Sequence, residues 1–159
     1  MRTLLLELRP AALTQSRFED LLRQLTEAVI GRARLPVHLS LDGERKLPPE
    51  VQVALYRIAQ ESLNNIVKYA RATQVNIHLV LSSTGVYLEI GDNGSGFDMN
   101  SIKPTSLGMR IMRERAGAIG ADFQVTSTPG KGTTISVTWN EAEVSGEGSA
   151  EPQAVKESS

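Results

Sequence analysis

Two kinds of hydrophobic spacing follow each other along the chain and predict a domain that contains both helices and strands. Apolar residues three and four positions apart, the period of an amphipathic helix, predict helices at about 16–31, 48–71 and 108–119. Apolar residues at every second position predict strands at 37–41, 75–81, 86–90, 123–126 and 133–139. Short turns join the second strand to the third and the fourth to the fifth, which predicts two hairpins.

The ends of these helices carry their own sequence patterns. Ser16 and Glu19 have the spacing of a capping box, and Gly31 is typical of a helix C-terminus. Pro49 suits the first position of the long helix, while Pro10 is expected to close a helical segment that precedes it. We therefore expect one helix to begin at Ser16 and end near Gly31.

The order of the elements predicts the fold class. Strands that are adjacent in sequence pair as hairpins, while the helices gather separately. We expect an α/β fold, an α+β two-layer sandwich, in which one mixed sheet has helices packed on one face. From residue 141 onward the chain has five glutamates against one lysine and no aromatic residue. We expect residues 141–159 to form a disordered acidic tail.

Composition narrows the function classes. The 159 residues suffice for one domain, the net charge of −1 favours no nucleic-acid partner, and the absence of cysteine excludes disulfides and thiolate metal sites. No apolar run reaches the roughly 18 residues that a membrane-spanning helix needs. We expect a cytoplasmic fragment with no membrane contact of its own, although the full-length protein could be membrane-anchored.

Three polar residues share one stripe of the long helix. Glu61, Asn65 and Lys68 are four and three residues apart, so they lie within a sector of about 60°. The carbonyl oxygen of Asn65 is a hard ligand of the kind that Mg²⁺ prefers, and Lys68 carries a charge suited to phosphates. The same stripe could also be a solvated helix face with a Glu–Lys pair.

A glycine-rich segment follows the strand at 86–90. Its sequence, Asp-Asn-Gly-Ser-Gly-Phe at residues 92–97, puts a carboxylate at a strand end beside Gly94 and Gly96, which let the backbone approach a flat ligand. Asp92 would accept a hydrogen bond from an adenine amino group and oppose the guanine carbonyl oxygen. Further on, an expected mobile loop at 98–107 leads to Gly108 at a helix start, where free N–H groups favour phosphate.

In this order, the three clusters resemble the ATP-binding domain that histidine kinases share with gyrase-type ATPases, Hsp90-type chaperones and MutL-type proteins. Residues 60–70 resemble its N box, residues 92–97 its first glycine-rich box, residues 107–109 its second, and residues 130–133 its final turn. The sequence Met-Arg-Glu-Arg-Ala at residues 112–116 is similar to histidine kinases akin to nitrate and nitrite sensors. Residues 8–10, Leu-Arg-Pro, resemble the end of the second dimerisation helix in that group, which implies that residues 1–15 are this helix end and a linker, and that residues 16–140 are the catalytic domain.

The resemblance implies a role for each matching residue. Glu61, Asn65 and Lys68 would be catalytic, with Asn65 as the Mg²⁺ ligand. The residues implied in ATP binding are Asn65, Lys68, Tyr69, Asp92, Gly94, Gly96, Phe97, Leu107, Gly108, Met109 and Thr133. The implied partners are the dimerisation helices of the full-length kinase, which carry the phosphate-accepting histidine, and a response regulator with a helix-turn-helix output domain.

One part of the family pattern is missing. The chain has two histidines, His38 and His78, both in predicted strands and neither followed by an acidic residue, so neither resembles the phosphoacceptor. We therefore expect a catalytic fragment that phosphorylates a histidine outside this chain. Two alternatives remain: a serine kinase of the anti-sigma-factor kind, and a nucleotide-sensing module that binds ATP without transferring phosphate.

Overall fold

The structure is a computed structural model that describes residues 10–96 and 106–141. The helix end expected before Pro10, most of the expected loop at 98–107, the predicted binding residue Phe97 and the expected tail after Glu141 lie outside these residues.

The predicted helices and strands lie within a few residues of their observed positions, and one further helix, α1 (Pro10–Gln15), lies where a linker was expected. The other helices are α2 (Phe18–Ala28), α3 (Pro49–Asn65) and α4 (Ser106–Ala118). The strands are β1 (Val37–Asp42), β2 (Val75–Ser82), β3 (Gly85–Asp92), β4 (Asp122–Thr128) and β5 (Gly132–Asn140). Two wide π-helical turns, η1 (Val29–Ala33) and η2 (Ile66–Ala70), continue α2 and α3. Pro10 begins α1, where proline loses no helical hydrogen bond, and the segment that it was expected to close lies outside the described residues.

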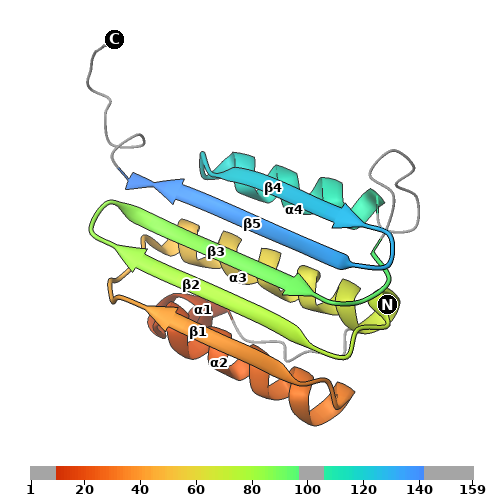
Figure 1. The fold of residues 1–159 in the computed structure, drawn as a ribbon. Coiled ribbons are helices and arrows are strands. Elements are labelled where there is room, and N and C mark those ends of the chain that lie inside the picture. Colours follow the sequence, from red (N-terminus) through yellow and green to blue (C-terminus); the bar gives the residue numbers. More distant parts are fainter. Residues whose placement is uncertain (1–9, 97–105, 142–159) are drawn as a thin grey trace.

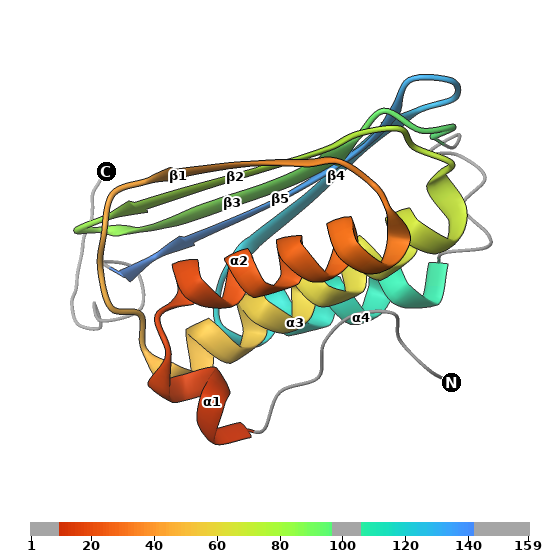
Figure 2. The ribbon, with the colours of Figure 1, turned by 90° about the horizontal axis from the view of Figure 1, so that it is seen from below.

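The strands form one five-stranded sheet in the order β1-β2-β3-β5-β4 (Figure 1). Strand β1 runs parallel to β2, and the other neighbours are antiparallel. Seen from below, the sheet forms one layer and the helices the other (Figure 2). The predicted mixed sheet with helices on one face is confirmed.

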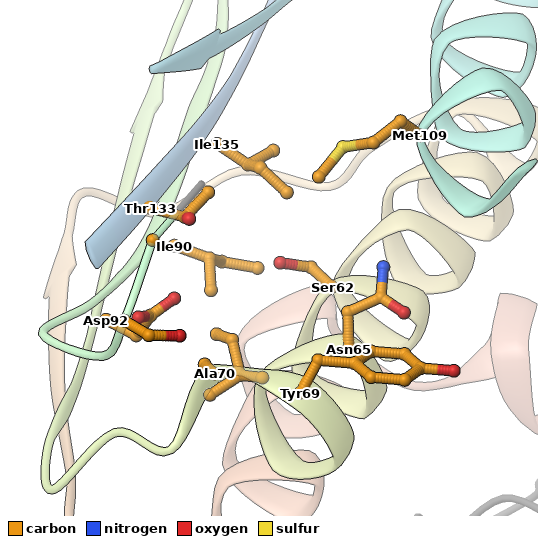
Figure 3. Close-up of a pocket in the computed structure, with 12 residues that line it drawn as sticks. Ser62, Asn65, Tyr69, Ala70, Ile90, Asp92, Met109, Thr133 and Ile135 are labelled. Carbon is orange, nitrogen blue, oxygen red and sulfur yellow. The ribbon is translucent and has the colours of Figure 1, made fainter. Parts of the chain in front are cut away.

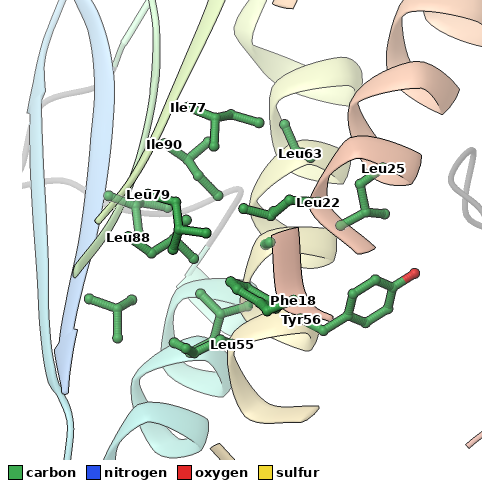
Figure 4. Close-up of a cluster of buried hydrophobic side chains, with 14 of the residues drawn as sticks. Phe18, Leu22, Leu25, Leu55, Tyr56, Leu63, Ile77, Leu79, Leu88 and Ile90 are labelled. Atoms are coloured by element: carbon green, nitrogen blue, oxygen red, sulfur yellow. The ribbon is translucent and has the colours of Figure 1, made fainter. Parts of the chain in front are cut away.

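The hydrophobic core lies between the two layers (Figure 4). Alternate residues of the sheet point toward the helices, among them Ile77, Leu79 and Leu88, which are at most 1% exposed. They pack with apolar side chains of α2 and α3 such as Leu22 and Leu55. Burial of each such side chain stabilises the fold by roughly 1.5–3 kcal/mol relative to exposure. This core fixes α3 against strands β3 and β5, whose ends carry Asp92 and Thr133.

Both predicted ends of α2 are wrong. The N-cap is Arg17, with no side-chain capping bond, because the first helical N–H groups, those of Asp20 and Leu21, donate to the carbonyl of Arg17. The carbonyl of Ser16 instead accepts a hydrogen bond from Gln52 of α3. At the other end, Gly31 lies inside η1, and Arg34 takes the left-handed conformation expected of a glycine, with φ 55°.

Candidate functional site

A pocket of about 280 Å³ lies at the C-terminal end of α3, bounded by the sheet on one side and by α4 on another (Figure 3). Six of the predicted binding residues line it: Asn65, Tyr69, Asp92, Gly96, Met109 and Thr133. Six further lining residues were not predicted: Ser62, Ile66, Ala70, Ile90, Ser95 and Ile135. Periodicity could have found three of these, because Ser62 and Ile66 lie on the same helical face as Asn65, and Ile90 lies two residues before Asp92 on its strand.

The end of α3 is closed by the segment that follows β3. Helix C-termini leave carbonyl groups without helical partners. Here the N–H of Ser95 donates to the carbonyl of Ala70 at 2.7 Å. Gly94 makes this approach possible, since a Cβ at that position would lie 2.1 Å from the same carbonyl oxygen. Gly94 was predicted to let the backbone approach the ligand. In the structure it lets the backbone approach the end of the helix.

Asp92 ends β3 at the wall of the pocket, beside apolar Ile90 (Figure 3). The N–H of Gly94 donates to its Oδ1 at 2.7 Å. Burial raises the pKa of Asp92 above its ordinary value of 3.8, while hydrogen bonds from the backbone of Gly94 and Thr133 act in the opposite direction. The result is a fixed, half-buried hydrogen-bond acceptor.

The turn between β4 and β5 supports this acceptor. The hydroxyls of Ser127 and Thr133 lie 2.8 Å apart, and the Ser127 hydroxyl donates to the carbonyl of Gly132. Gly96 adopts φ +63° against the turn, where a Cβ would lie 2.1 Å from the carbonyl oxygen of Thr128. Residues 94–96 are therefore held between the end of α3 and the β4–β5 turn.

The polar stripe of α3 lies under the N-terminal turn of α4. A Cβ on Gly108 would lie 2.7 Å from Oε2 of Glu61 and 3.2 Å from Nδ2 of Asn65. Glu61 and Asn65 are partly buried there, and the Asn65 Nδ2 is buried without a hydrogen-bond partner among the described residues. The stripe is thus not merely a solvated helix face at these two positions, although Lys68 is exposed.

Some predicted residues border the pocket without lining it. Glu61, Lys68, Gly94, Leu107 and Gly108 are not among its lining residues, and Leu107 is 61% exposed. Gly108 nevertheless lies in the first turn of α4, directly over Glu61 and Asn65, so the N-terminus of this helix lies next to Asn65. The structure therefore brings the phosphate-binding candidates to one side of the pocket and Asp92 to another.

A Mg²⁺ ion fits the donors on this side only with help from a ligand. Among residues 10–96 and 106–141, no three His, Cys, Asp or Glu side chains are grouped as a metal site. The side chains of Asn65 and Glu61 offer oxygen donors, and Mg²⁺ is commonly held by one or two protein groups together with substrate phosphates and water.

Among the helices of residues 10–96 and 106–141, none has the length and hydrophobicity that a membrane-spanning helix needs.

Residues 50–143 match the family described as "Histidine kinase-, DNA gyrase B-, and HSP90-like ATPase". The chain belongs to this ATPase family. The match covers α3 from its second residue, the whole pocket and every strand except β1, so it includes each described residue of the candidate site.

Two proteins with similar sequences are described as a sensor histidine kinase and a sensor protein. The chain is 36% identical over 138 residues to the sensor histidine kinase LiaS of Bacillus subtilis. This alignment covers 86% of this chain and 38% of LiaS. It is also 36% identical over 138 residues to the sensor protein VraS of Staphylococcus saprophyticus, with 86% of this chain and 39% of VraS covered. The chain thus spans less than half the length of these relatives.

Solved structures agree on the fold. The histidine kinase domain of the blue-light activated histidine kinase from Erythrobacter litoralis EL346 matches with a TM-score of 0.66 at 23% identity, over 79% of this chain and 61% of that one. Full-length ShkA, crystallised with AMPPNP, matches with a TM-score of 0.66 at 20% identity, over 77% and 30% of the two chains. The predicted fold of a histidine-kinase ATPase domain is confirmed.

Proposed function

We propose that this chain binds ATP–Mg²⁺ as the catalytic domain of a two-component sensor histidine kinase. It transfers the γ-phosphate to a histidine on a dimerisation helix of its full-length protein, for relay to a response regulator with a helix-turn-helix output domain. The observation that carries the proposal is the two-sided pocket: a fixed carboxylate among apolar residues on one side, and the Glu61–Asn65 stripe under a helix N-terminus on the other.

The Asp92 side of the pocket suits adenine. Ile90, Ile135 and Met109 supply apolar surface for a flat ring, and the Asp92 carboxylate accepts from the exocyclic amino group. Gly96 and Thr133 hold the backbone around this acceptor, as their hydrogen bonds and close contacts indicate. Guanine would place a carbonyl oxygen against the carboxylate, so this side favours ATP over GTP.

The α4 side suits the triphosphate. In this proposal Asn65 holds Mg²⁺, Lys68 contacts phosphate, and the backbone at Leu107, Gly108 and Met109 binds phosphate at the positive end of α4. Glu61 orients Asn65, and Tyr69 flanks the nucleotide. When bound, Mg²⁺ would neutralise charge on the phosphates. Phosphoryl transfer needs mainly positioning and charge stabilisation, which these residues can provide.

The phosphate acceptor is proposed to lie outside this chain. His78 lies on the face of the sheet opposite the helices, where its Nε2 is 3.2 Å from Oδ2 of Asp42. His38 is an exposed residue of the edge strand β1. Because the pocket lies on the helix-covered face, neither imidazole can line up with a γ-phosphate bound there.

The subgroup akin to nitrate and nitrite sensors is part of the proposal. Its support is the sequence of residues 112–116 in α4, together with Leu-Arg-Pro at residues 8–10. This assignment favours a histidine kinase over a serine kinase, and the partly buried Glu61 and Asn65 favour catalysis over nucleotide sensing alone.

Calorimetry with ATP and GTP, each with Mg²⁺, tests the nucleotide assignment. We expect ATP to bind and GTP to bind at least tenfold more weakly. The phosphotransfer assignment is tested by adding the dimerisation helices of the full-length protein and labelled ATP. Acid-labile phosphohistidine should form on those helices and not on this chain alone. Equal affinity for GTP would refute the placement of adenine, and stoichiometric labelling of His38 or His78 would refute the separate acceptor.

A further inference from the structure

Ser62 is a buried polar residue that the roles above leave unexplained. It lies on α3 and lines the pocket, and its hydroxyl points from the helix toward the sheet (Figure 3). The residue is 1% exposed, and its Oγ has no hydrogen-bond partner among the described residues. Ser62 therefore presents an unpaired donor and acceptor to the pocket.

This arrangement is costly for the empty protein. A buried hydroxyl without a partner destabilises a fold because it gives up its hydrogen bonds to water. A serine in a helix often avoids this cost by donating to the carbonyl four residues earlier, but that bond is not formed here. The core neighbours of Ser62 along α3, Ile58 and Leu63, are apolar and fully buried, so an alanine would suit the site better unless a ligand supplies the missing partner.

We propose that Ser62 is a base-specificity residue whose hydroxyl donates a hydrogen bond to a ring nitrogen of the bound adenine. The inference rests on the proposed function, since it requires the base to lie in this pocket. Asp92 on the sheet offers an acceptor, and Ser62 on α3 offers a donor from the other side. A 6-aminopurine complements this pair, because it carries an amino donor and ring-nitrogen acceptors. The ligand class is thus the adenine nucleotides.

Removal of the Ser62 hydroxyl should weaken ATP binding without destabilising the fold. We expect Ser62→Ala to lower ATP affinity by about 3- to 10-fold, the usual range for one net hydrogen bond. The melting temperature of the nucleotide-free variant should equal or exceed that of the wild type, because the unpaired hydroxyl is gone. A loss of stability with unchanged ATP affinity would show that Ser62 is a structural residue.

Thr26 offers a matched control. It is also buried, at 7% exposed, and its hydroxyl also lacks a partner among the described residues, but it lies on α2 and does not line the pocket. Thr26→Val should leave ATP affinity unchanged. An equal loss of ATP affinity in Thr26→Val and Ser62→Ala would contradict a specific role for Ser62.

Base analogues locate the contact. ATP analogues in which one ring nitrogen is replaced by carbon (1-deaza, 3-deaza and 7-deaza) should be titrated into wild type and Ser62→Ala. One analogue should bind both proteins equally, because it lacks the acceptor that Ser62 contacts, while the other two keep the 3- to 10-fold difference. If all three keep the full difference, the ring-nitrogen contact is wrong. If wild type does not bind ATP at all, the proposed function fails instead.

Discussion

Helices α2 and α3 end in the same way, but only α3 ends at the pocket. Each continues into a five-residue π-helical turn and then reaches an arginine in the left-handed conformation, Arg34 with φ 55° and Arg71 with φ 54°. Each then enters one of two neighbouring parallel strands, in which Val37 pairs with Val75. The backbone shape of a helix end is therefore not what makes a site in this fold.

The side chains at matching positions differ in chemistry. Counted back from the two arginines, Asn65 of α3 corresponds to Ala28 of α2, and Ser62 corresponds to Leu25. Leu25 is fully buried in the core, whereas the Ser62 hydroxyl faces the pocket (Figures 3 and 4). The end of α2 thus has apolar residues, Ala28 and Leu25, at the two positions where α3 has the polar residues Asn65 and Ser62.

The surroundings of the two ends differ as well. Residues 94–96 close over the end of α3, and Gly94 is packed against Ala70. At the end of α2, a Cβ added to Gly31 would meet nothing within 4 Å. The comparison indicates that the pocket depends on two additions to a common helix end: polar residues on α3 and a glycine-rich segment packed over it.

The largest effect is expected from making α3 resemble α2 at the metal position. Asn65→Ala should reduce phosphotransfer in the full-length kinase by at least about 100-fold and weaken Mg²⁺-dependent ATP binding, because the proposed carbonyl ligand is lost. The fold should remain intact, since Ala28 occupies the same position in α2. Radiolabelled phosphotransfer and circular dichroism are the measurements. Phosphotransfer at the wild-type rate in this variant would contradict the assignment of Asn65 as the Mg²⁺ ligand.

Two glycine substitutions test the difference in packing. Gly94→Ala should lower the free energy of unfolding by about 2–3 kcal/mol and impair ATP binding, because the new Cβ would lie 2.1 Å from the Ala70 carbonyl oxygen. Gly31→Ala is the matched control: it meets no atom and should stabilise the chain by up to about 1 kcal/mol. Urea denaturation measures both. Equal changes in the free energy of unfolding for the two variants would contradict tight packing at Gly94 and open space at Gly31.

Asp92→Asn should have a smaller effect that is confined to the adenine side of the pocket. The amide presents a donor to the adenine amino group, so ATP affinity should fall by about 1–3 kcal/mol. Isothermal titration calorimetry of the two proteins measures the difference. Unchanged affinity for ATP would be incompatible with adenine at Asp92.

The same variant should change how stability depends on pH. Burial raises the folded-state pKa of Asp92, so its contribution to stability is fully present below 3.8 and is lost as pH rises through the raised value. Asn has no such titration. The stability of wild type relative to Asp92→Asn should therefore decrease between acidic and neutral pH in urea denaturation. A relative gain of wild-type stability over this interval would mean that the pKa is lowered.

Much of this molecule follows from local sequence patterns, but only six of the twelve residues that line the pocket were predicted. Alternating and helical periods located the strands and long helices, and the order of the polar clusters pointed to the ATPase family. Gly31 was wrongly expected to end its helix: the helical turns continue through η1, and the left-handed residue that ends them is Arg34, a residue type that does not signal a helix end in sequence. Ser62 could not be recognised as unusual, since a serine inside a helix becomes informative only when its burial and lack of partner are known.

Hydrogen exchange at the two helix ends shows whether the nucleotide binds at the end of α3 and not at the end of α2. With Mg²⁺ and a non-hydrolysable ATP analogue, amides of η2 and of residues 92–96 should exchange at least about tenfold more slowly, because the nucleotide contacts and stabilises these segments. Amides of η1 should exchange at the same rate with and without the analogue. Equal protection of η1 and η2, or none at η2 with the nucleotide bound, would contradict a nucleotide site at the end of α3.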